Sequence, residues 1–318
     1  MIVTLTMNPA LDRTYYVDHL QPGSLHRPDQ VEEDAGGKGI NVSRTLQILG
    51  KESVVVGVLA GHTGHRIEEQ LKSLGLQTDF LFLPEGETRI NTKIVESDGT
   101  LTELNEKGPE VKAGTLNEVA GVLKKYASPD TVYVLSGSVP EGAPDGYYRY
   151  LTAALHSVGG RVLLDADGLL LSEGIGGYPD IIKPNIRELV ACYAAAGEME
   201  NGAPDQQHLV RFARSIISKA KDGNGFACIS LGDKGALFVN GEKTLFSRAL
   251  PVPVKSTVGA GDAMVAAIAA CQEEGKTMEY CARLAVACAT AACTTAGTRP
   301  ADMTSIQSYL QGVKLQEI

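Results

Sequence analysis

The segment 256–264, S-T-V-G-A-G-D-A-M, combines residue types that can do chemistry. Gly259, Ala260 and Gly261 leave the backbone nearly bare ahead of an alanine-rich apolar run that predicts a buried helix. N–H groups at a helix N-terminus can converge on an anion, and Asp262 would lie in the first turn of that helix. An anion site beside a possible general base suits phosphoryl transfer to a hydroxyl. A strand-to-helix turn in which Asp262 only caps the helix is the alternative.

A second glycine-rich helix start lies at residues 35–41, A-G-G-K-G-I-N. It is not a P-loop, because Lys38 is followed by Gly39 and no glycine stands five residues before Gly37. Its backbone N–H groups can still hold an anionic or hydroxylated ligand, with Lys38 as a point charge. The alternative is a bare tight turn.

Polar residues recur where the predicted strands end, at Asp12, Ser136, Ser138, Asp165, Lys183, Asn185, Ser230 and Asp262. The carboxyl ends of parallel strands share one rim, where ligands bind in open α/β sheets. Arg89, beside Asn91, can reach an anion there or can be a solvated strand residue. This clustering supports a ligand site more strongly than any single motif does.

The elements that must position these residues follow a strand–helix rhythm. Apolar strands alternating with helices predict a parallel sheet covered on both faces. Two polar segments, at about 13–34 and 87–106, interrupt the rhythm and are expected to form a small separate sheet, with a hairpin turn at Asp98-Gly99. A further strand is expected at 249–254, directly before the 256–264 segment.

Composition excludes several classes of function. The 318 residues carry a net charge of −9 and no basic run, which disfavours nucleic-acid binding. The N-terminus lacks the pattern of a signal peptide, and the longest apolar stretch is far shorter than a membrane span. Six cysteines without a C-x-x-C pair indicate buried reduced thiols. We therefore expect a cytoplasmic protein that binds neither nucleic acid nor membrane.

Four motifs occur in order and cover nearly the whole chain: G-G-K-G-x-N at 36–41, N-I-R-E at 185–188, L-G-D-K-G at 231–235 and T-V-G-A-G-D at 257–262. On these motifs the chain resembles the PfkB/ribokinase family of carbohydrate kinases. The resemblance implies a single domain over residues 1–318. It would have a three-layer α/β/α ribokinase-like fold, a mostly parallel central sheet and a small β-sheet lid. In this family the lid is often shared between the two subunits of a homodimer. ATP and Mg²⁺ are the implied cofactors.

The resemblance also implies a role for each matching residue. Asp262 would be the catalytic base, and the N–H groups of residues 259–262 the anion hole. Sugar hydroxyls would be held at or near four residues: Asp12, Gly37, Lys38 and Asn41. The ATP site would be lined by five: Lys183, Asn185, Ser230, Gly232 and Gly235. Glu188, together with Asn185, would order Mg²⁺ through water.

Three further segments resemble the family members that act on sugar phosphates: N-P-A-x-D at 8–12, T-R-I-N at 88–91 and S-G-S-V-P at 136–140. A phosphorylated substrate needs extra cations and donors, which Lys38, Arg89 and Ser138 can supply. The implied reaction is transfer to the 6-hydroxyl of fructose 1-phosphate, with tagatose 6-phosphate nearly as good a match. Fructose 6-phosphate fits less well, because Thr102 and Glu103 stand where some such enzymes carry a lid arginine. A kinase of nucleosides or free sugars and a non-catalytic sugar-phosphate sensor are the alternatives.

Overall fold

The computed structural model describes residues 1–198, 205–220, 223 and 225–318. Within them, the larger sheet has ten strands in the order β14-β13-β12-β11-β10-β9-β8-β1-β4-β5. Seven pair in parallel: β1 (Ile2–Thr6), β4 (Ser53–Ala60), β5 (Gln77–Leu83), β8 (Val132–Ser136), β9 (Arg161–Asp165), β10 (Ile181–Ile182) and β11 (Phe226–Ser230). Three extend the sheet antiparallel: β12 (Ala236–Asn240), β13 (Thr244–Ser247) and β14 (Leu315–Glu317).

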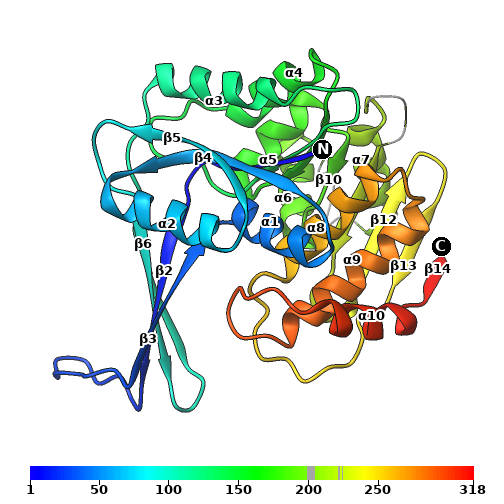
Figure 1. Cartoon of the computed structure of the whole chain (residues 1–318). Coiled ribbons are helices and arrows are strands. Elements are labelled where there is room, and N and C mark those ends of the chain that lie inside the picture. The colour runs from blue at the N-terminus through cyan, green and yellow to red at the C-terminus, as the bar shows by residue number, and fades with distance from the viewer. Residues whose placement is uncertain (199–204, 221–222, 224) are drawn as a thin grey trace.

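Helices cover both faces of this sheet, as expected for apolar parallel strands (Figure 1). One face is covered by α1 (Lys38–Ile48), α2 (Gly61–Ser73), α8 (Ala260–Glu273), α9 (Met278–Cys293) and α10 (Met303–Gly312). The other face is covered by α3 (Ala113–Lys125), α4 (Tyr147–His156), α5 (Gly168–Gly174), α6 (Ile186–Ala195) and α7 (Gln206–Ile217). The predicted three-layer α/β/α architecture is confirmed.

A separate four-stranded sheet projects from the body (Figure 1). Its order is β3-β2-β6-β7, formed by β2 (Ala10–Val17), β3 (Gln30–Gly36), β6 (Arg89–Glu96) and β7 (Leu101–Asn105). We call it the small sheet. It begins and ends within a few residues of the two polar insertions predicted from the sequence. Because β2 follows β1 after only three residues, the small sheet starts directly at the rim of the larger one.

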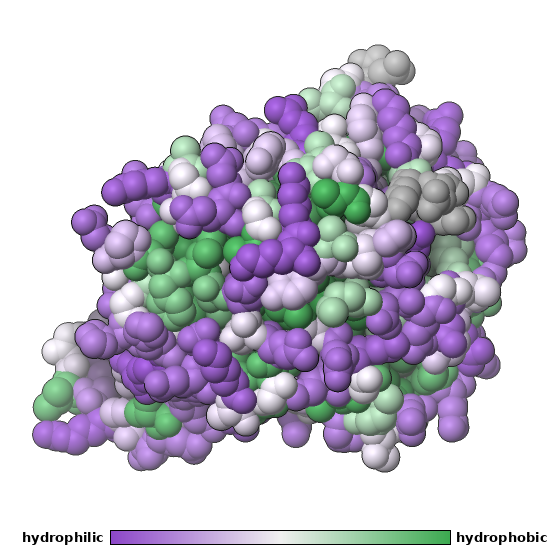
Figure 2. Space-filling model, turned by 45° about the horizontal axis from the view of Figure 1, so that its top comes forward, coloured by the Kyte–Doolittle hydropathy of each residue, from purple (hydrophilic) through white to green (hydrophobic). Residues whose placement is uncertain are grey.

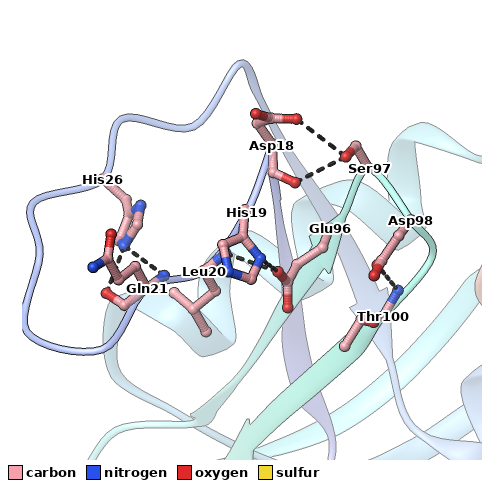
Figure 3. Close-up of polar contacts among 9 residues, drawn as sticks. All are labelled: Asp18, His19, Leu20, Gln21, His26, Glu96, Ser97, Asp98 and Thr100. Atoms are coloured by element: carbon pink, nitrogen blue, oxygen red, sulfur yellow. Dashed lines mark hydrogen bonds and ion pairs between the residues drawn. The ribbon is translucent and has the colours of Figure 1, made fainter.

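Short polar contacts hold the far end of the small sheet together (Figure 3). Glu96 Oε2 lies 2.6 Å from His19 Nδ1 and accepts the Leu20 N–H at 2.8 Å. At the predicted hairpin turn, the Gly99 N–H donates to the Glu96 carbonyl and the Thr100 N–H to Asp98 Oδ1. The Asp98-Gly99 turn is therefore confirmed.

Some local predictions were wrong or incomplete. Residues 249–254 form no strand, because Pro251 and Pro253 have no N–H to donate to a ladder. The segment instead runs irregularly to the turn at Gly259. Three elements were not predicted: β5, α5 and β14.

The core on the α8 face is built largely from small side chains. Residues 262–271 of α8 are all buried, and their alanines let α1 and α9 pack closely on either side.

Of the six cysteines, all free, Cys293 alone is partly exposed. In the part of the chain that is described, no helix combines the length and apolarity needed to cross a membrane. Figure 2 shows a mostly hydrophilic face with a broad hydrophobic area at its left and smaller ones elsewhere.

Candidate active site

The predicted rim of polar residues forms where the order in which strands are added to the larger sheet changes direction. β1 pairs with β4 on one side and with β8 on the other, so the strands that follow it run outward in both directions. Such a switch point leaves a crevice at the carboxyl ends of the central strands. Asn8 and Ser136 lie at the ends of β1 and β8, and Lys38 begins α1 close by.

Asp262 lies in the first turn of α8, and only 8% of it is exposed. Its Oδ2 accepts a hydrogen bond from Asn41 Nδ2 at 2.8 Å. The two glycine-rich helix starts, 221 residues apart in sequence, therefore meet through this contact. The Asn41 Oδ1 atom is buried and has no hydrogen-bond partner among the described residues.

The turn before Asp262 has the backbone geometry of an anion site. Gly259 caps α8 with φ 82°, a left-handed conformation that favours glycine. The Ala260 N–H donates to the Thr257 carbonyl at 3.4 Å. The N–H groups of Gly261 and Asp262 belong to the first turn of the helix, where no intrahelical carbonyl is available to them. They are the groups best placed to receive an anion.

A buried ion cluster lies beside this turn and is centred on Asp165, at the end of β9. Lys183 Nζ is 3.1 Å from Asp165 Oδ1, and Lys38 Nζ is 3.9 Å from Oδ2, which also accepts from Ser136 Oγ at 3.2 Å. A Cβ added to Gly261 would lie 3.4 Å from Lys183 Nζ, so this lysine faces the start of α8.

The cluster sets the charges around the turn. Burial, and then repulsion from Asp165, raise the pKa of Asp262 to about 6, while Asn41 and the lysines oppose the rise. Burial also acts against ionisation of Asp165 and Lys183, but their mutual attraction outweighs it. The pKa of Asp165 therefore lies below its ordinary value and that of Lys183 above. Asp262 is a carboxylate whose proton affinity suits a general base.

At the small-sheet side of the crevice, Asp12 projects from β2. Its Oδ1 accepts from Asn91 Nδ2 at 3.0 Å and its Oδ2 from Lys93 Nζ at 2.8 Å. Gly36, on the neighbouring β3, lies against this carboxylate, because a Cβ there would be 2.8 Å from Asp12 Oδ2. Gly37 is the N-cap of α1, so the predicted residues Asp12, Gly37 and Lys38 are brought together.

Arg89 lies at the start of β6, and its hydrogen bonds within the described structure all go to backbone carbonyls. Its guanidinium donates to the Asn8 carbonyl at 2.9 Å and 3.3 Å and to the Glu106 carbonyl at 3.3 Å. Burial lowers the pKa of Arg89, and Asp12 partly opposes this. Asn8 Nδ2 also lies 3.5 Å from Ser138 Oγ, so Arg89 and Ser138 flank the same residue.

The N-x-x-E motif forms a capping box at the start of α6. Asn185 Oδ1 accepts the Glu188 N–H at 2.9 Å, and Glu188 Oε2 accepts the Asn185 N–H at 2.7 Å. The motif thus has a structural role that its sequence pattern also predicts. In the described chain, no group of three or more His, Cys, Asp or Glu side chains could hold a metal ion by itself.

The residues predicted to line an ATP site lie along neighbouring strand ends. Ser230 ends β11 and bridges in parallel to Asn185. Gly232 and Gly235 flank a short 3₁₀ turn between β11 and β12, which is closed by the Leu231 N–H donating to the Gly235 carbonyl at 2.8 Å. Lys183 and Asn185 stand next to them at the end of β10.

Sequence reasoning missed the part played by three residues. Asp165 was noted only as a polar strand end, although it holds both lysines. Asn91 was noted as a neighbour of Arg89 and as part of the T-R-I-N segment, but not as a partner of Asp12. Lys93 was not considered, although β-strand alternation puts Arg89, Asn91 and Lys93 on one face and could have revealed the row.

A doubly covered α/β sheet with a buried carboxylate and lysines at a helix N-terminus suits an enzyme that transfers a phosphoryl group to an alcohol. The chain belongs to the pfkB family of carbohydrate kinases, which matches residues 5–305. The family predicted from the sequence motifs is thus confirmed.

Among its relatives, a 1-phosphofructokinase of Xanthomonas campestris is 37% identical over 293 residues, covering 90% of this chain and 88% of the relative. A tagatose-6-phosphate kinase of Staphylococcus epidermidis is 33% identical, covering 85% of this chain and 84% of the relative. The structure of phosphofructokinase-2 from Escherichia coli in complex with potassium superposes with a TM-score of 0.89 at 27% identity, covering 98% of each chain. The predicted similarity to kinases of sugar phosphates is therefore confirmed.

Proposed function

We propose that this protein phosphorylates the 6-hydroxyl of fructose 1-phosphate with ATP, giving fructose 1,6-bisphosphate and ADP. The observation that carries the proposal is Asp262, a buried carboxylate with a pKa raised to about 6, set at the N-terminus of α8 beside Asn41. A sensor that only binds its ligand would not need a proton acceptor at that position.

In this mechanism, the substrate hydroxyl gives its proton to Asp262 as its oxygen attacks the γ-phosphorus of ATP. The bond from that phosphorus to the β–γ bridging oxygen breaks, and ADP leaves. The N–H groups at the start of α8 and the Lys183 ammonium stabilise the negative charge on the transferred group. Asn41 holds Asp262 in place through its 2.8 Å hydrogen bond.

ATP would lie over the strand ends formed by Lys183, Asn185 and Ser230, with the turn from Gly232 to Gly235 beside it. The chain's donors fit Mg²⁺, which keeps several waters and takes one or two carboxylates plus substrate phosphates. Glu188, with Asn185, would hold it through water. When bound, the ion would neutralise charge on the ATP phosphates.

The preference for a phosphorylated sugar rests on Arg89, Lys38 and Ser138. Arg89 has no carboxylate partner in the described chain, so its charge is available to a substrate phosphate. Asp12, Asn41 and the backbone at Gly37 would hold sugar hydroxyls. Tagatose 6-phosphate is the second candidate acceptor, because relatives of both kinds resemble this chain over most of its length.

We also propose that residues 1–318 form one kinase domain in which the small sheet acts as a lid over the sugar. Two exposed apolar side chains on one face of that sheet, Val31 and Leu104, support a homodimer formed through it.

The substrate is tested by measuring kcat/KM with ATP and a panel of acceptors: fructose 1-phosphate, tagatose 6-phosphate, fructose 6-phosphate, ribose and adenosine. We expect fructose 1-phosphate to give the highest value and the unphosphorylated acceptors to give values lower by at least about 10²-fold, because they leave Arg89 unpaired. A preference for ribose or adenosine would refute the proposal.

The pH dependence of turnover tests the role of Asp262. Because its pKa is about 6 and the base must be ionised, kcat should fall about tenfold per pH unit below that value. The second ionisation of a sugar phosphate also lies near pH 6, so the pH dependence of sugar-phosphate binding to Asp262→Asn serves as the control. A flat kcat profile down to pH 4.5 would rule out Asp262 as the base.

A further inference from the structure

Lys93 is placed unusually for a lysine of an exposed sheet. Its side chain is only 14% exposed, and its Nζ lies 2.8 Å from Asp12 Oδ2, while the Asp12 side chain is 10% exposed. Glu103 stands directly opposite Lys93 on the neighbouring strand β7. Even so, the ammonium is directed to Asp12 on β2, the strand on the other side.

The two cations in the row Arg89, Asn91 and Lys93 differ in whether a carboxylate neutralises them. Arg89 is bonded only to carbonyls in the described structure, so its positive charge is not neutralised by an ion pair. Lys93 is neutralised by Asp12. An anionic group is therefore attracted to the Arg89 end, whereas the Lys93 end is electrically balanced.

The balanced end has free capacity to accept hydrogen bonds. A carboxylate has about four lone-pair positions, and Asp12 uses one for Asn91 and one for Lys93. Asn91 Oδ1 is also buried and has no hydrogen-bond partner among the described residues. These acceptors suit sugar hydroxyls, which are donors.

We infer that Lys93 is a positioning residue for sugar recognition: it keeps the Asp12 carboxylate aimed at the sugar hydroxyls without touching the phosphate. Without Lys93, the nearly buried Asp12 side chain would lose its ion-pair partner and would be held only by the hydrogen bond from Asn91, so it could turn away from the sugar hydroxyls. Arg44 is paired at 3.7 Å with Asp34, which lies opposite Asp12 on β3, so this cation is already occupied. The inference rests on the proposed function and names a determinant of its substrate affinity.

The test replaces Lys93 with Met, which keeps the length and apolar stem of the side chain. We expect KM for fructose 1-phosphate to rise about 10- to 100-fold, the effect of losing a charged hydrogen bond, with KM for ATP within twofold and kcat within about threefold. Lys93→Arg should recover most of the affinity. Lys72→Met removes an exposed lysine paired with Glu68 and should change none of these constants.

Two further readouts separate the explanations. Inorganic phosphate as a competitive inhibitor should bind Lys93→Met as well as wild type, because Lys93 does not hold the phosphate. Tenfold weaker inhibition would overturn the positioning role, as would an unchanged KM for the sugar phosphate. Thermal stabilisation by sugar phosphates without ATP measures the same binding independently of turnover. If wild type transfers no phosphate, the proposed function fails, whereas this binding comparison still decides the role of Lys93.

Discussion

Replacing Asp262 with Asn is expected to lower kcat by about 10²- to 10⁴-fold while the protein stays folded. The amide keeps the shape of the side chain and can still accept the hydrogen bond from Asn41, but it cannot take the proton of the attacking hydroxyl. KM for the sugar phosphate should change little, because the lost interaction belongs to the transition state. Steady-state kinetics at pH 8, where Asp262 of the wild type is ionised, measures the difference.

The same substitution should raise stability. The folded-state pKa of Asp262, about 6, exceeds its ordinary value of 3.8, so the ionised carboxylate opposes folding at neutral pH by an amount of order 2–3 kcal/mol. Wild-type stability gains this contribution as pH falls from 6 toward 4, and the Asn variant has it at every pH. Asp130→Asn, at an exposed position, is the matched control. Near-normal turnover in Asp262→Asn would remove this residue from the mechanism.

Replacing Asp165 with Leu is expected to destabilise the fold by about 3–5 kcal/mol and lower Tm by roughly 10 °C. The variant leaves the Lys183 ammonium buried without the carboxylate that lies 3.1 Å away in the wild type. Loss of the carboxylate costs less free energy at Lys38, because its side chain is 35% exposed and water can solvate it. Thermal unfolding followed by circular dichroism measures the loss.

A double variant, Asp165→Leu with Lys183→Met, distinguishes the buried charge from lost packing. Removing both partners leaves no buried lysine without its carboxylate, and Lys38 is exposed enough for water to solvate it, so the double variant should recover at least half of the lost stability. If the double variant is as unstable as the sum of the two single variants, the ion pair is not what Asp165 contributes. A Tm for Asp165→Leu within 2 °C of wild type would also show that the carboxylate of Asp165 is not needed to stabilise the buried lysine.

The turn at 257–262 and the helix start that follows it could be predicted from sequence because their signals are local. Glycines followed by an apolar alanine run indicate a helix start, and Asp262 follows at once. The capping box at Asn185 and Glu188 could be predicted in the same way, since N-x-x-E is its sequence pattern. The prediction of a strand at 249–254 was wrong for a reason that is also local, because the two prolines of this segment outweigh its apolar pattern.

The charge pairs could not be predicted in the same way, since each depends on which strands are neighbours. Asp165 and Lys183 meet because β9 and β10 pair side by side in the large sheet. Asp12 and Lys93 are 81 residues apart and meet only because β2 pairs with β6 in parallel. Residue types and spacing along the chain carry no direct record of such pairings, so the sequence indicated the rim but not its ion pairs.

The most direct test of the central claim is to measure the products formed from fructose 1-phosphate and ATP with Mg²⁺ present. We expect one fructose 1,6-bisphosphate for each ADP, with both products reduced in parallel by Asp262→Asn. Formation of ADP without bisphosphate, or no reaction with fructose 1-phosphate while another acceptor is phosphorylated efficiently, would contradict the proposed function.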